Sequence, residues 1–79
     1  MSRYRLDISG NIDLSDYSNI NDYIELVGPN DSFIVTFDKV SNENIDIVYN
    51  MLQEKDFTIN SKEEQQDGNI YLHAMKRRS

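Results

Sequence analysis

Alternating and helical patterns of apolar residues follow each other twice along this chain, and they restrict the folds that it can adopt. In Arg3–Ile8 every second residue is apolar, which is typical of a half-buried strand. Ser32–Asp38 is the most strand-like stretch, and its apolar inner run predicts a central place in the sheet. Apolar residues at helical spacing follow each strand. The pattern therefore predicts two successive strand–helix units.

Each predicted helix has a start signal of its own. Asp13 is the predicted N-cap of the first, because its carboxylate can accept a hydrogen bond from the N–H of Ser15 or Asp16. The segment G-P-N-D at 28–31 ends this helix and forms a turn. Ser41 is the predicted N-cap of the second helix, which we expect to stop near residue 55.

The last third of the chain predicts two further strands. Phe57–Asn60 reads as a short strand, Lys62–Gly68 as a polar loop ending in an Asp-Gly turn, and Asn69–Met75 as the last strand. Right-handed crossovers place both helices on one face of the sheet. The sequence therefore predicts an α+β fold: a two-layer α/β sandwich in the order β-α-β-α-β-β. Its mixed four-stranded sheet has the strand order 1-2-4-3, within a single domain over residues 1–79.

Charge is distributed unevenly over the 79 residues. The net charge is −6, and all fourteen acidic residues lie between Asp7 and Asp67. An acidic body repels phosphate backbones, so a nucleic-acid partner is disfavoured. The alternative that the two ends of the chain bind nucleic acid stays open, because basic residues gather there. They are Arg3, Arg5, Lys76, Arg77 and Arg78.

The sequence has no cysteine and no apolar segment of the kind that targets or spans a membrane, and both facts exclude classes of function. Without cysteine the chain has no disulfide, no thiolate nucleophile and no zinc–sulfur site. Met1–Ser9 lacks the apolar run of a signal peptide, and no window approaches the length of a membrane span. We therefore expect a cytoplasmic protein without a membrane partner.

Three short motifs match a known family. Leu6, Asp7 and Gly10 have the type and spacing of the hallmark L-D-x-x-G-x-x-C-P-x-P at a first strand–helix junction. The turn at 29–31 is similar to a Pro-Gly-Asp turn, and the run at 67–72 is similar to a closing D-G-x-x-Y/L hairpin. By these motifs and its element order, nearly the whole chain resembles the TusA/SirA-like sulfur-carrier family. The C-terminal domain of translation initiation factor three resembles it in fold only, and the acidic body argues against its RNA-binding role.

The chain departs from this family at the position that carries the chemistry. In the family a cysteine at the head of the first helix carries a persulfide, and the helix N-terminus favours its thiolate. Here that position is Asp13, which cannot carry sulfur and which we interpret as a cap at a degenerate family site. The resemblance therefore implies the scaffold without the sulfur-carrier activity, and we expect no enzyme. An accessory protein that docks to sulfur-transfer enzymes is the alternative that the resemblance adds.

Other residues that could carry chemistry have simpler explanations. His73 is the only histidine, and no nucleophile stands at a recognisable spacing from it. Glu63, Glu64 and Asp67 lack the ligand spacing of an EF-hand loop and fit a solvated loop. The sequence therefore predicts no catalytic residue, no cofactor and no metal site.

The sheet face opposite the helices is the predicted partner-binding surface. Strand alternation places aromatic, methionine and arginine side chains there, the types that are enriched in interface cores. We expect a protein partner or a homodimer to use this face or the edge strand beside it. The predicted residues are Arg3, Arg5, Ile34, Thr36, Tyr71, His73 and Met75.

Overall fold

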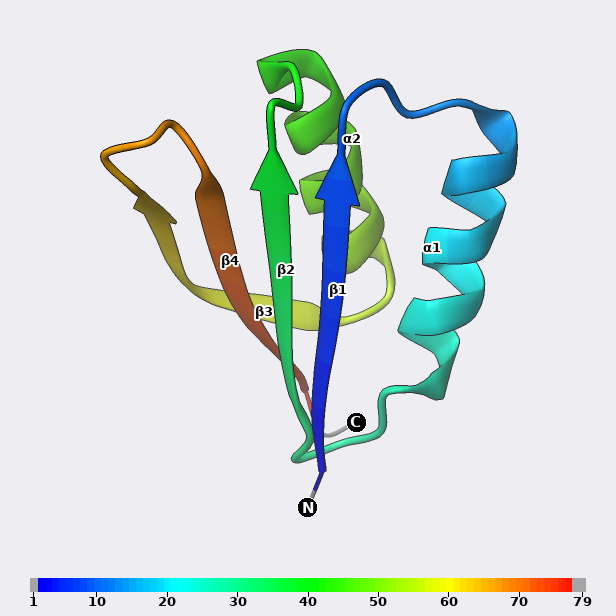
Figure 1. Cartoon of the computed structure of the whole chain (residues 1–79). Coiled ribbons are helices and arrows are strands. Elements are labelled where there is room, and N and C mark those ends of the chain that lie inside the picture. Colours follow the sequence, from blue (N-terminus) through cyan, green and yellow to red (C-terminus); the bar gives the residue numbers. More distant parts are fainter. Residues whose placement is uncertain (1, 78–79) are drawn as a thin grey trace.

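The computed structural model describes residues 2–77, which form a four-stranded sheet and two helices (Figure 1). The sheet has the order β1-β2-β4-β3; β1 pairs with β2 in parallel, and β4 runs antiparallel to both β2 and β3. This is the predicted fold, and the predicted central place of Ser32–Asp38 is confirmed. The elements are β1 (Arg3–Ser9), α1 (Leu14–Leu26), β2 (Ser32–Asp38), α2 (Asn42–Glu54), β3 (Phe57–Glu64) and β4 (Ile70–Lys76).

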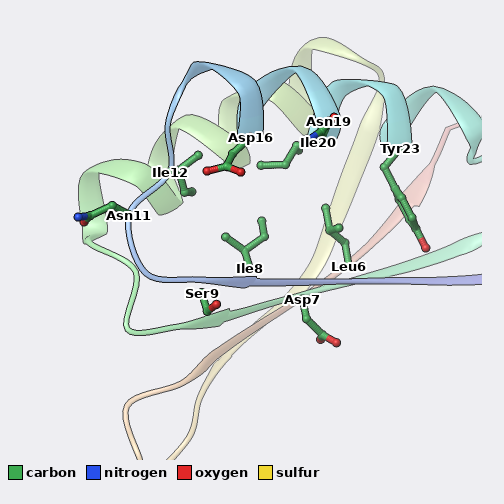
Figure 2. A pocket seen from close by; sticks show the side chains of 10 residues that line it. All are labelled: Leu6, Asp7, Ile8, Ser9, Asn11, Ile12, Asp16, Asn19, Ile20 and Tyr23. Carbon is green, nitrogen blue, oxygen red and sulfur yellow. The ribbon is translucent and has the colours of Figure 1, made fainter.

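Both helices cover the same face of the sheet, and the core lies between these two layers (Figures 1 and 2). The inward side chains of β2 and β4 are almost fully buried, because strands on both sides and helices above exclude water. Burying a Val, Leu, Ile or Phe side chain contributes about 1.5–3 kcal/mol, so this layer supplies most of the stability. The core includes Ile24, Val27, Phe33, Val35, Phe37, Ile45, Val48, Leu52, Leu72 and Ala74.

Both predicted N-caps are confirmed. The Oδ1 of Asp13 accepts a hydrogen bond from the Asp16 N–H at 2.9 Å, and Asp16 Oδ2 accepts one from the Asp13 N–H at 3.1 Å. This reciprocal pair is a capping box, which satisfies two backbone donors at the start of α1. Ser41 Oγ accepts a hydrogen bond from the Asn44 N–H at 3.3 Å and caps α2.

The third strand is longer than its sequence indicates. It continues past Asn60 to Glu64, with a register shift between Ile59 and Ser61, so the predicted loop over Lys62–Glu64 is wrong. The side chains of residues 60–64 are all exposed, and they therefore leave no apolar alternation to read. Backbone pairing with β4 holds this half of β3 in the sheet.

The β3–β4 connection is consequently a short turn. Gln65 donates its N–H to the Asn69 carbonyl at 2.7 Å, and Gly68 has a φ of 88°. Glycine adopts this conformation without a steric cost, which explains the Asp-Gly signal at the turn. The last strand, predicted over Asn69–Met75, begins and ends one residue later.

Candidate functional site

The seven residues predicted for the open sheet face do share that face. In the strand register Arg5 lies opposite Ile34, and Ile34 lies opposite His73. Thr36 lies opposite Tyr71 in the same register. Because side chains alternate along a strand, these residues point away from the core, as Asp7 does in Figure 2. Arg3 and Met75 complete the set near the chain ends of β1 and β4.

The centre of the open face is apolar and half-buried although no helix covers it. Ile34, Tyr71, His73 and Met75 are each partly shielded by their neighbours in the sheet. A shallow depression of about 530 Å³ lies over part of this centre, lined by Arg3, Ile34, His73 and Met75 among others. The centre of the face is therefore partly shielded from water, and the basic side chain of Arg3 lies beside it.

A polar network crosses the β1 side of this face. Asp7 Oδ1 accepts hydrogen bonds from the Thr36 hydroxyl and from Arg5 Nε, the latter at 3.0 Å. The Thr36 hydroxyl and then Arg5 hold the pKa of Asp7 below its ordinary value, and Asp7 raises the pKa of Arg5. The sequence-based set omitted Asp7, although the alternation of β1 already places it beside Arg5. Thr36 is thus fixed in position by a neighbouring carboxylate.

Three residues of β3 also belong to the open face and were missed. Thr58 lies opposite Met75, Ser61 opposite His73 and Glu63 opposite Tyr71, and the register shift after Ile59 determines that Ser61 and Glu63 face outward. The sequence carries no signal for this shift, since residues 60–64 are polar throughout. Glu63 adds negative charge at the β3 side of the face, whereas Arg3 and Arg5 add positive charge at the β1 side.

A second hollow lies between β1 and α1, on the other side of the sheet. It has a volume of about 320 Å³, and Figure 2 shows the side chains around it. The Tyr23 hydroxyl at one end donates a hydrogen bond to the Arg5 carbonyl at 2.9 Å. The hollow was not predicted. It is lined by Leu6, Asp7, Ile8, Ser9, Asn11, Ile12, Asp16, Asn19, Ile20 and Tyr23.

At the position that the resemblance aligns with the family cysteine, Asp13 caps α1. Asp13 is exposed, and the Asp16 backbone N–H lowers the pKa of its carboxyl group. The carboxylate therefore completes the helix start, where a thiolate would stand in a sulfur carrier.

The remaining candidates lie apart from one another. His73 is in the middle of the open face, while Glu64 and Asp67 are at and beyond the end of β3. Among residues 2–77 no group of three His, Asp or Glu side chains is placed to hold a metal ion. In the same part of the chain no helix is both long and apolar enough to cross a membrane.

Two of the basic residues near the ends of the chain are paired with acidic residues. Arg5 pairs with Asp7, and Arg77 Nη2 lies 3.8 Å from Asp56 Oδ1. Arg78 lies outside the described residues. Because these pairs reduce the local positive charge, they argue against the alternative of nucleic-acid binding through the termini.

Comparison with models of known protein families found no match, and comparison with curated proteins found none either. The resemblance to the TusA/SirA-like family therefore stays a prediction, based on the spacing of Leu6, Asp7 and Gly10 and on the element order.

Proposed function

We propose that this chain is a non-catalytic protein-interaction or regulatory module that docks a partner protein, or a second copy of itself, through the open sheet face. The observation that supports it is the uncovered cluster of Ile34, Tyr71, His73 and Met75, which stays half-buried within a single sheet layer. Aromatic, methionine and arginine side chains are enriched where interfaces are most tightly packed. A partner that covers this cluster removes apolar surface from water, which is the main driving force of association.

The non-catalytic part of the proposal rests on what stands at the candidate chemical sites. Asp13 accepts the capping hydrogen bond of α1, and Asp7 is held by Thr36 and Arg5. Each carboxylate has a structural task, and the sequence supplies no thiol. Docking to sulfur-transfer enzymes remains the alternative that the family resemblance implies, and a cytoplasmic location remains an expectation from the sequence.

The Tyr71→Asp variant tests the proposed face, because it places a charge at the apolar centre opposite Thr36. We expect it to weaken self-association in light scattering, or partner capture from the native cell, while circular dichroism shows an intact fold. Ile47→Asp is the matched control, since Ile47 is a 45% exposed apolar residue of α2 on the other side of the molecule. It should associate as the wild type does.

Two results would overturn the proposal. One is a wild-type protein that is monomeric at every concentration and captures no partner. The other is a Tyr71→Asp variant that associates as strongly as wild type. If the captured partner is a cysteine desulfurase or a sulfurtransferase, the alternative function replaces the general one.

A further inference from the structure

The outer edge of β1 exposes backbone hydrogen-bonding groups. Ser32 donates its N–H to the Ser2 carbonyl at 3.0 Å, and Gly10 donates its N–H to the Asp38 carbonyl at 3.1 Å. The even-numbered residues of β1 therefore turn their backbone groups toward β2. Since these groups alternate along a strand, those of Arg3, Arg5, Asp7 and Ser9 point outward, away from the sheet.

One side chain already binds this outer edge. The Tyr23 hydroxyl donates to the outward carbonyl of Arg5 at 2.9 Å, as an added strand would do. Within residues 2–77 no hydrogen bond is formed by the backbone N–H of Asp7 or of Ser9. These two residues also line the 320 Å³ hollow between β1 and α1, so the unpaired part of the edge lies beside the hollow.

The hollow gives an added strand a place for its side chains. Leu6 and Ile8 point from β1 toward α1 in Figure 2, and both remain half-buried. Their register neighbours on β2, Val35 and Phe37, are completely covered. A strand beside β1 directs every second side chain into this space, where apolar residues cover Leu6 and Ile8.

The opposite edge of the sheet, formed by β3, is protected against pairing with another strand. Proteins guard free edges with bulges, charged side chains or proline, because an unguarded edge pairs with other chains. β3 has a register shift at Asn60 and the exposed charges Lys62, Glu63 and Glu64. β1 also carries exposed charges, Arg3, Arg5 and Asp7, of which Arg5 and Asp7 pair with each other, but it has neither a register shift nor a proline.

The negative charge of α1 favours a basic segment in the hollow over an acidic one. α1 carries Asp16, Asp22 and Glu25 and has no lysine or arginine. Figure 2 shows Asp16 on the side of α1 that borders the hollow, and within residues 2–77 only its Oδ2 accepts a hydrogen bond, from the Asp13 N–H. A second copy would bring another acidic α1 beside this one, which like charges disfavour. A basic segment has the complementary charge.

We propose that the free edge of β1 and the hollow beneath α1 bind an extended segment of a partner protein by strand addition. Its apolar side chains lie beneath α1 and a lysine or arginine reaches Asp16. This surface is distinct from the open sheet face, so the inference goes beyond the function proposed above.

A short peptide tests the inference directly. In Lys-Thr-Val-Thr-Ile-Thr, capped at both ends, alternation places Lys, Val and Ile on one side of an extended chain. We expect this peptide to shift the amide NMR signals of Asp7, Ser9 and the first half of α1. The Asp16→Asn protein should bind up to about fivefold more weakly, because a half-exposed ion pair contributes at most about 1 kcal/mol. The version that begins with Glu should bind at least as weakly, because it brings two carboxylates together.

Ser9→Pro provides a backbone test. Proline removes the outward N–H of Ser9 and leaves the hydrogen bonds from β1 to β2 in place. We expect it to lose peptide binding, whereas Ser9→Ala keeps the N–H and should bind as wild type does. Thermal unfolding of both variants verifies that the fold is intact.

Three outcomes would overturn the inference. They are no saturable shifts with the peptide, shifts centred on Tyr71 and His73, or self-association that Ser9→Pro abolishes, which would assign the edge to a second copy. Tyr71→Asp should leave peptide binding unchanged, so a failure here is distinguishable from a failure of the proposed function.

Discussion

The carboxylate of Asp7 accepts a hydrogen bond from the hydroxyl of Thr36, which joins β1 to β2 on the open sheet face. Thr36 is only 9% exposed, and its other neighbour in the register is Tyr71. The contact gives the hydroxyl of a nearly buried threonine an acceptor, and it keeps Asp7 beside Arg5. The β1 side of the proposed interface is ordered by this contact.

Thr36→Val should therefore raise the pKa of Asp7 toward its ordinary value of 3.8. The hydroxyl stabilises the ionised carboxylate, and valine has nearly the same shape but no donor. A carbon-13 NMR titration of the Asp7 carboxyl group measures the change. Thr36→Ser keeps the hydroxyl and should titrate as wild type does, and an unchanged pKa in Thr36→Val would show that the hydrogen bond is absent in solution.

Asp13→Ala should lower the melting temperature by about 4–8 °C, because α1 loses the acceptor for one of its first backbone donors. Asp13→Ser retains a capping oxygen and should lose much less. Differential scanning calorimetry of the three proteins makes the comparison. Equal melting temperatures for Asp13→Ala and wild type would contradict the assignment of Asp13 as a structural cap.

Acid should destabilise the protein partly through Asp31. The Ser2 N–H, at 2.8 Å, and the Gly28 N–H, at 2.9 Å, hold the pKa of this carboxyl group below its ordinary value of 3.8. A pKa that is lower in the folded state stabilises the fold above the unfolded-state value, and this contribution disappears as the pH falls through the folded-state value. We therefore expect the melting temperature of the wild type to decline below about pH 4.

Asp31→Asn isolates this contribution. Its melting temperature should be lower than that of wild type at neutral pH, and it should decline less on acidification, because asparagine does not titrate. Some decline remains, since the pKa values of Asp7, Asp13 and Glu25 are also lowered in the folded protein. Parallel curves for the two proteins would mean that Asp31 makes no pH-dependent contribution.

The order of elements could be predicted from the sequence, because the buried face of each helix or strand requires apolar residues at a regular spacing. Phe33, Val35 and Phe37 alternate, and Ile45, Val48 and Leu52 recur at helical spacing, as their burial requires. Local chemistry also determined the caps, because Asp13 and Ser41 bond to residues only three positions away. The seven residues of the open face followed from the same alternation.

The second half of β3 was not readable, because its place in the sheet depends on backbone pairing with β4 and its side chains are all exposed. Tertiary structure alone also decided the contact between Asp7 and Thr36 and the hollow beneath α1. The contact joins residues 29 positions apart, and the hollow lies between two consecutive elements whose spacing is set by how α1 packs over β1. Periodicity records which face of an element is buried, whereas the position of one element against another is fixed only when the whole core packs.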